Sequence, residues 1–540
     1  MKKLLVLLLV CCMLTGCGIP PAETTAPTEA EIQPTDPPVP QFQLTGDLVD
    51  IKLRDQSITI TGDGSGVYTS RDIVYYENRT QYHSGNPYGD GSEGDMHSAE
   101  EATEHLVVNI TAPGNYRISG RLKGQIRIDL GEEARQNPDS VVNLILDGVD
   151  ITCTVGPAIL FRNVYECDNN WSVETARPDV DTLAAGANLI LAEGSENIVR
   201  GSYVAKIYKD QEGEKKLWKQ DGAIYSYMSM NIYGPGSLDL YADNEGLDTE
   251  LHLTIFGGDI TIRAGNDGIN TNEDGVSVTA IHGGTLRILA GLGDEGDGID
   301  SNGYLVIYGG NVVASAHPAA DAGLDSDLGS FIHGGTVIAL GSTMDWPESD
   351  SEQVTMNLQF ASPQNAGSEI RITREDGSVV FAYDPSQDPV MQENLRMIQG
   401  TILSCPDFRV GDRYAVFLGG VQMAYTGTDV MQHPGGMPPA EGGQQPGSGP
   451  GFPGGPDFPG GATPPGDMPQ PPEGDFTLPP QPGTDIPAAP QGQPPEDWTM
   501  PSMPGEGPEG QMPSGPEGEK QALFFMQDKV NFFSGLTPTE

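Results

Sequence analysis

Acidic and amide side chains recur at matching places in four short segments of the chain. Each segment reads Gly, an aliphatic residue, Asp or Asn, and then Ser or Thr; the four are residues 246–250, 268–272, 298–302 and 323–327. If such segments stack, their acids form columns about 5 Å apart, and unscreened carboxylates at that spacing repel one another. Ca²⁺ would relieve the repulsion, because it accepts six to eight oxygen ligands in flexible geometry. The sequence therefore predicts calcium between adjacent segments.

The predicted calcium ligands are the acids and amides of these columns and the acids that precede them. They are Asp243, Glu245, Asp248, Asp267, Asn270, Asp294, Asp297, Asp300, Asp321, Asp325 and Asp327. The alternative is that these residues only form turns, in which Asp, Asn and Gly are common in any case. Two known calcium motifs, the twelve-residue loop between helices and the nine-residue Gly-rich repeat, do not fit the spacing.

A second column consists of rings, each directly before a Gly-Gly pair: Phe256, His282, Tyr308 and His333. The residue before each ring is Ile, so alternation along a strand places the rings on the surface if the Ile column is in the core. Exposed rings on a rigid face are suited to holding long sugar chains. The alternative is ring stacking between strands that only stabilises the sheet.

These columns require a regularly repeating β structure. The first Gly of the four pairs is Gly257, Gly283, Gly309 and Gly334, at spacings of 26, 26 and 25 residues. After each pair comes an alternating strand, with two inward columns (Ile260, Leu286, Val312, Val337 and Ile262, Ile288, Ala314, Ala339) and one outward column between them (Thr261, Arg287, Val313, Ile338). Helical patterns long enough for βαβ crossovers are lacking, which favours the coils of an all-β parallel β-helix. Tandem β-sandwiches, the competing fold, would not give this fixed period.

Composition and charge exclude other classes of protein. The chain has 540 residues, with 76 Asp and Glu against 28 Lys and Arg, giving a formal net charge of −48. Nucleic-acid binding needs clustered basic residues, so no nucleic-acid partner is expected. No internal apolar run approaches the ~20 residues that span a bilayer, which excludes a polytopic membrane protein.

The two ends of the chain differ from the middle. Residues 1–16 have the pattern of a signal peptide, and Cys17 after Leu-Thr-Gly is typical of bacterial lipidation, with a Pro/Thr/Glu-rich linker over residues 17–46. An ordinary secretory signal is the alternative. We expect an exported protein, lipid-anchored at Cys17 to the outer face of the bacterial cell membrane, and a monomer.

The β-helix domain is expected over residues 47–430. Residues 431–520 hold more than half of the 45 prolines and are expected to be a disordered acidic tail. Residues 521–540 are apolar again, and either form an edge strand on the core or bind a partner. A disulfide between Cys153 and Cys167 is possible but cannot be deduced from spacing.

Several motifs together resemble a clostridial-type carbohydrate-binding domain family, first classed as a domain of unknown function. They are residues 146–151 (LDGVDI), 156–159 (GPAI), 191–197 (LAEGSEN), 221–224 (DGAI) and the Gly-aliphatic-Asp/Asn repeats, and the resemblance covers roughly residues 50–345. It implies a right-handed parallel β-helix at the cell surface that binds calcium and plant-type polysaccharides, including cellulose and acidic pectin-like chains. Residues 203–219 look like an insertion relative to that pattern.

Because the implied fold is shared with pectate lyases, a calcium-dependent polysaccharide lyase is the rival function. Such an enzyme needs Lys or Arg as the base that removes a proton next to a uronate carboxyl. The chain has no Lys between Gln220 and Glu519, although Lys219 and its neighbours precede the repeats. We therefore expect non-catalytic, calcium-dependent polysaccharide binding. A surface adhesin or structural protein is the further alternative.

Overall fold

A computed structural model describes residues 40, 42–76, 93–168, 172–208, 216–342, 345–428 and 520–539. The predicted signal peptide, Cys17, most of the linker and the Pro/Gly-rich tail lie outside these residues. The described part is mainly β, and 31 of its strands belong to one long, largely parallel hydrogen-bonded sheet. No described helix is long and apolar enough to cross a membrane.

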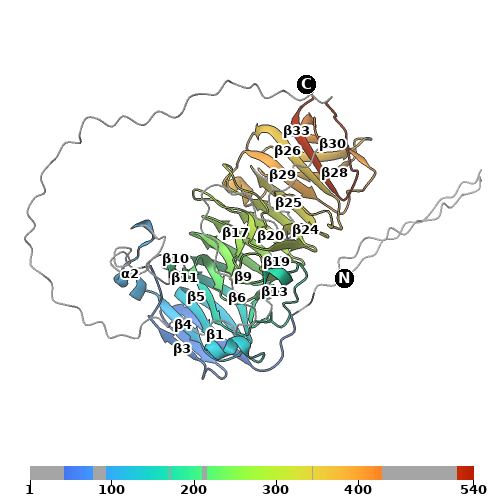
Figure 1. The fold of residues 1–540 in the computed structure, drawn as a ribbon. Helices are drawn as coiled ribbons and strands as arrows, with labels where there is room; N and C mark the ends of the chain where they lie inside the picture. Colours follow the sequence, from blue (N-terminus) through green and yellow to red (C-terminus); the bar gives the residue numbers. More distant parts are fainter. Residues whose placement is uncertain are drawn as a thin grey trace, which may run out of the picture. The chain divides into compact units, whose positions relative to one another are not determined.

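The chain passes repeatedly through three ladders of parallel strands, and one pass is called a coil here. The acid ladder is β7 (Ile159–Asn163), β12 (Gly222–Ser226), β15 (Glu245–Thr249), β18 (Ile269–Thr271) and β21 (Ile299–Ser301). The ring ladder is β8 (Ala187–Leu191), β13 (Met230–Tyr233), β16 (Leu253–Ile255), β19 (Val278–Ile281), β22 (Tyr304–Ile307) and β24 (Gly329–Ile332). The third ladder is β9 (Glu196–Gly201), β14 (Ser237–Ala242), β17 (Asp259–Ala264), β20 (Thr285–Leu289), β23 (Asn311–Ser315) and β25 (Thr336–Gly341). Figure 1 shows these strands stacked in the order of the sequence.

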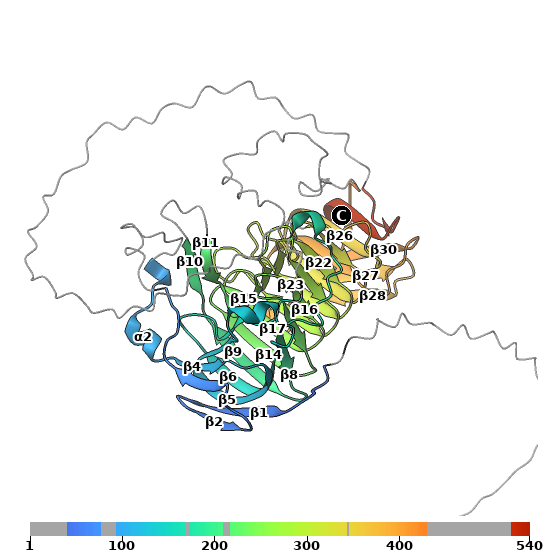
Figure 2. The same ribbon diagram turned by 60° about the horizontal axis from the view of Figure 1, so that its bottom comes forward.

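The first coils are built from longer strands and a few short helices. The strands are β1 (Leu48–Asp55), β2 (Ile58–Thr61), β3 (Val67–Ser70), β4 (Leu106–Ile110), β5 (Gly114–Asp129) and β6 (Val142–Thr152). The helical turns are η1 (Glu93–Asp95), α2 (Ala99–Thr103), η2 (Glu132–Gln136) and η3 (Val173–Thr175). Strands β10 (Val204–Tyr208) and β11 (Lys216–Gln220) form a separate antiparallel hairpin (Figure 2). In the sequence it follows β9 of the third ladder and precedes β12 of the acid ladder.

The register of the third ladder confirms the predicted inward columns. Leu286 lies opposite Ile260 and Val312, and Ile288 lies opposite Ile262 and Ala314, all with 0% exposure. This follows because parallel pairing places equivalent positions of successive coils side by side. In the outward column, Thr261, Arg287 and Val313 are half-buried, whereas Ile338 is only 5% exposed because it packs into a second core.

The second core belongs to a C-terminal group of mostly antiparallel strands. These are β26 (Thr355–Gln364), β27 (Ile370–Arg374), β28 (Val379–Tyr383), β29 (Ile398–Ser404), β30 (Arg413–Leu418), β31 (Val421–Ala424), β32 (Phe524–Phe525) and β33 (Val530–Pro538), with the turn η4 (Met391–Glu393). Strand β29 pairs antiparallel with β25 and so ends the parallel stacking. Strand β33 pairs parallel with β26 and antiparallel with β31, so the apolar C-terminal segment contributes to this core.

Cys153, Cys167 and Cys405 are all free in the described part of the chain. The disulfide between Cys153 and Cys167 that the sequence left open is therefore absent from the structure. Burial raises the pKa of the Cys153 thiol to about 12, which makes it unreactive as a thiolate.

Candidate functional site

The acid ladder aligns the predicted column of acids and amides. Asp248 lies beside Asn270, and Asn270 lies beside Asp300. A single bridge between Ile299 and Leu324 places Asp325 next in the row. The aliphatic residue before each of these positions is fully buried, so the apolar core fixes where the acids lie.

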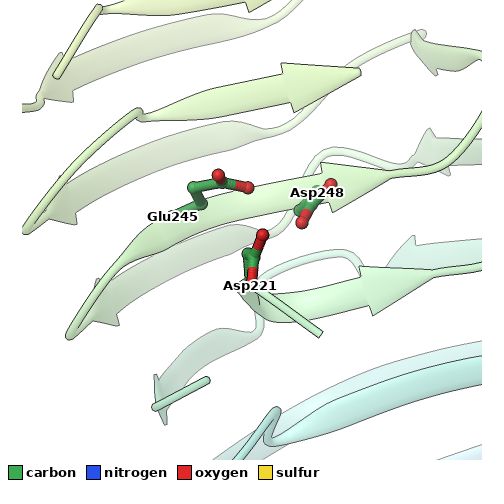
Figure 3. Close-up of side chains that lie close together, drawn as sticks. All are labelled: Asp221, Glu245 and Asp248. Carbon is green, nitrogen blue, oxygen red and sulfur yellow. The ribbon is translucent and has the colours of Figure 1, made fainter. Parts of the chain in front are cut away.

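Three carboxylates of two neighbouring coils form a buried cluster, called the acidic cluster here. It consists of Asp221, just before β12, with Glu245 and Asp248 from β15 (Figure 3). Their ligand oxygens lie within 4.8 Å of one another, and the three residues are 5%, 5% and 0% exposed. This cluster could hold a metal ion.

Oδ2 of Asp248, in the acidic cluster, and Oδ1 of Asn270, beside it in the ladder, are buried without a hydrogen-bond donor among the described residues. The two residues are 0% and 6% exposed. Leaving a buried acceptor unsatisfied costs about 1–3 kcal/mol. A hard cation would satisfy both oxygens, so the donor set fits a metal that takes oxygen ligands.

Burial makes the charged form of the aligned acids unfavourable. Burial and the charge of Glu245 raise the pKa of Asp248 well above its usual value, and burial, Glu245 and Asp300 do the same for Asp267. Burial and the neighbouring Asp325 raise the pKa of Asp300 to about 8. Burial, partly offset by the Ala322 N–H, raises the pKa of Asp297 to about 7. Without a counter-charge the row would be partly protonated at neutral pH.

The other predicted ligands are placed differently. Asp243, Asp294 and Asp327 are exposed, and all lie outside the acidic cluster. Asp321 and Asp325 are half-buried, and Oδ2 of Asp321 accepts a hydrogen bond of 3.1 Å from the N–H of Gly296.

Sequence reasoning missed Asp221, Lys219 and Asp345 as members of this region. Asp221 is followed by Gly222 as Glu245 is followed by Gly246, a signal that could have identified it. Lys219 Nζ lies 2.9 Å from Oδ2 of Asp221, but it comes from the irregular hairpin, which has no repeat to follow. Asp345 accepts hydrogen bonds from Ser326, and burial and Asp325 raise its pKa to about 7.

The predicted ring column is continuous and its rings stack on one another. Phe256 stacks on His282 at 5.1 Å between centroids, His282 on Tyr308 at 4.5 Å, and Tyr308 lies 5.3 Å from His333. Tyr233 extends the stack on the other side of Phe256, at 4.7 Å. Phe256 is therefore only 6% exposed rather than on the surface as expected, while the other three predicted rings are half-buried. Phe256, His282 and Tyr308 each have a ring on both sides, which leaves mainly their edges for other contacts.

A hollow of about 520 Å³ lies beside Phe256, at the turn between the ring ladder and the third ladder. Its lining includes the Gly257–Gly258 turn and the polar side chains of Glu193, Asp259 and Thr285. Gly258 has a φ of +113°, which explains the second glycine of the pair, but Gly257 has no positive φ. This volume lies in the range of small-ligand pockets, about 300–1,000 Å³.

Among curated proteins, no significant match is found. Among solved structures, the chain is similar to a polysaccharide lyase-like protein from C. thermocellum, solved as a gadolinium derivative, with 22% identity and a TM-score of 0.32, over 54% of this chain and 93% of that one. Residues 104–403 match the family model described as carbohydrate-binding domain-containing protein. Since this match spans more than half of the chain, the protein belongs to this carbohydrate-binding domain family.

Proposed function

We propose that the protein is a non-catalytic, calcium-dependent polysaccharide-binding protein built as a right-handed parallel β-helix. The observation that carries the calcium proposal is the pair of buried, unsatisfied oxygens on Asp248 and Asn270, beside Asp221 and Glu245. Calcium bound there would neutralise these buried carboxylates and hold neighbouring coils in register, so a protein of net charge −48 could still present an ordered surface to a polysaccharide.

The state of Lys219 favours binding over lyase catalysis. Burial tends to lower the pKa of its ammonium, but Glu245, Asp221 and Asp248 raise it well above the usual value. A base that removes a proton must be unprotonated, so Lys219 is unsuited to that task at neutral pH.

The test is retention of the full chain on immobilised polygalacturonate with calcium and with a chelator. We expect retention with calcium, release by the chelator, and no rise in ultraviolet absorbance from unsaturated products. An absorbance rise would establish the lyase instead, and failure to bind any polysaccharide would favour the adhesin. Asp248→Asn should weaken retention, whereas the exposed Asp243→Asn serves as the matched control.

The sugar chain is proposed to lie along the edges of Phe256, His282, Tyr308 and His333 and to reach the hollow beside Phe256. Thr285 and Thr336 occupy one outward column of the third ladder, but only Thr285 is among the residues that line the hollow. Thr285→Tyr would fill the hollow and should weaken binding at least tenfold, while Thr336→Tyr should leave it unchanged. Equal effects of the two variants would remove the hollow from the binding site.

We also propose export and lipid anchoring at Cys17, which rest on the sequence alone. Mass spectrometry of the mature N-terminus would test this, with an acylated Cys17 as the expected result. A mature chain that begins elsewhere would contradict it.

A further inference from the structure

The hairpin β10–β11 delivers one positive charge to the acidic cluster. Its strands pair through Val204 with Gln220 and Ile207 with Trp218. The second strand ends at Gln220, directly before Asp221, so Lys219 lies close to the start of β12 in the acid ladder. Residues 203–219 stand outside the repeating pattern, and this charge is therefore a feature of this chain rather than of the repeats.

Lys219 is fully engaged with the oxygens of this region. Its side chain is 5% exposed, and its Nζ donates to Oδ1 of Asn272 and lies 2.9 Å from Oδ2 of Asp221. Asn272 in turn donates to Oδ1 of Asp248. The ammonium thus contacts the acidic cluster directly through Asp221 and indirectly, through one amide, at Asp248.

The charges of this group do not balance. Asp221, Glu245 and Asp248 contribute three negative charges when ionised, and Lys219 contributes one positive charge. The remaining charge of minus two matches a divalent cation, and the orphan oxygens belong to Asp248 and Asn270, which pair between this coil and the next. Lys219 forms an ion pair with Asp221, whose carboxylate oxygens such a cation would otherwise use as ligands.

We infer that Lys219 is a built-in counter-ion that competes with the divalent cation for the carboxylates of the acidic cluster and so sets its affinity. This inference rests on the proposed binding of calcium. When calcium binds, the ammonium is repelled by the ion and loses its contact with Asp221. Ion binding is thereby linked to the hairpin β10–β11, whose second strand carries Lys219.

The experiment is calorimetric titration of the full chain with calcium alone, for the wild type and for Lys219→Met. Removing a positive charge a few ångströms from the ion should tighten binding at one site tenfold or more. Lys219→Gln keeps polar contacts with Asp221 and Asn272 and folds more readily, and it should also bind more tightly. Lys219→Arg keeps the charge and should stay near the wild-type affinity. Lys123→Met, at a half-exposed ion pair with Glu104, is the matched control for loss of a lysine.

Hydrogen exchange gives a second readout that does not depend on affinity. In the wild type, calcium should speed exchange in β10 and β11, and in Lys219→Met this calcium effect should disappear. Unchanged or weaker calcium affinity in both Lys219→Met and Lys219→Gln would overturn the inference. If only these variants bind calcium, Lys219 replaces the ion entirely, which supports the inference but refutes calcium binding by the wild type at this cluster. If no variant binds calcium, both proposals fail.

Discussion

The two ends of the acid ladder solve the same electrostatic problem in different ways. At the near end, the coils of β12 and β15, the ammonium of Lys219 contacts Asp221 directly and Asp248 through the amide of Asn272, and the charge of Glu245 also raises its pKa. At the far end, the groups that act on the pKa values of Asp297 and Asp300 are other carboxylates and a backbone N–H. Asp248 at the near end and Asp300 at the far end each follow a fully buried aliphatic residue of one column, but only the near end has the inserted hairpin beside it. A repeating fold can thus align acids in one column whose charges are balanced differently from coil to coil.

The largest expected effect is a fall in the stability of the metal-free protein as the pH rises from 5 to 8. Burial raises the pKa of Asp297 to about 7 and that of Asp300 to about 8, whereas both titrate near 4 in the unfolded chain. Between these values the folded state binds more protons than the unfolded state, so the free energy of unfolding decreases with pH. The total is on the order of 5 kcal/mol, measurable by denaturant unfolding in a chelator.

Asp300→Asn sharpens that test, because it removes the most shifted of these acids without changing its shape. The variant should be more stable than the wild type at pH 8, and the two should have similar stabilities at pH 5. If the stability of the metal-free wild type did not change across this pH range, the negative charges of Asp297 and Asp300 would already be compensated within the folded protein.

The second effect concerns the near end, where a substitution should lower stability, in contrast to the gain expected for Asp300→Asn at the far end. Lys219→Met leaves three buried carboxylates without their ammonium, which should cost about 3–5 kcal/mol in a chelator at pH 7. The measurement is again denaturant unfolding, beside Lys123→Met. If Lys219→Met were as stable as the wild type while Asp300→Asn gained stability, Lys219 would not compensate the near-end carboxylates, and the charges of both ends would be equally unbalanced.

The third effect is stabilisation by calcium. At a free concentration 100 times its Kd, one bound ion should add about 2.7 kcal/mol to the free energy of unfolding at pH 7. Burial and Glu245 raise the pKa of Asp248 well above its usual value, so calcium must displace a proton from this carboxyl; its affinity should increase with pH, and binding should release protons into the buffer. An unchanged thermal midpoint after chelation would mean that the aligned acids only form turns.

The smallest effect should come from the exposed acids of the predicted set. Asp243→Asn and Asp294→Asn should change stability by no more than about 0.5 kcal/mol and calcium affinity by less than twofold. A large loss of affinity in either variant would extend the metal site beyond the buried row.

The columns could be predicted from the sequence because a fixed period is a property of the chain itself. Once Gly257 and Gly283 are set 26 residues apart, the alignment of Ile260 with Leu286 and of Phe256 with His282 follows. The burial of Phe256 could not be predicted, since it depends on Tyr233, whose coil departs from the regular repeat. The position of Lys219 could not be predicted either, because an inserted hairpin has no neighbouring repeat to copy.

The same limit applies to the C-terminal group of strands. The apolar residues 521–540 indicated either an edge strand on the core or a partner-binding segment, and no periodicity identifies β26 and β31 as the partners of β33. Pairing across a long stretch of sequence is determined by the packing of Phe524 and Phe533 in the second core, which only the folded structure contains.

The return of the chain to the second core has a consequence for how the protein tolerates change. Tyr425 donates a backbone hydrogen bond of 3.0 Å to the carbonyl of Gln521, so the described strands on either side of residues 429–519 meet at one place. The entropic cost of closing such a connection grows only with the logarithm of its length. Evolution or an engineer could therefore lengthen, shorten or replace this segment, or open new termini within it, while the strands on either side keep their partners.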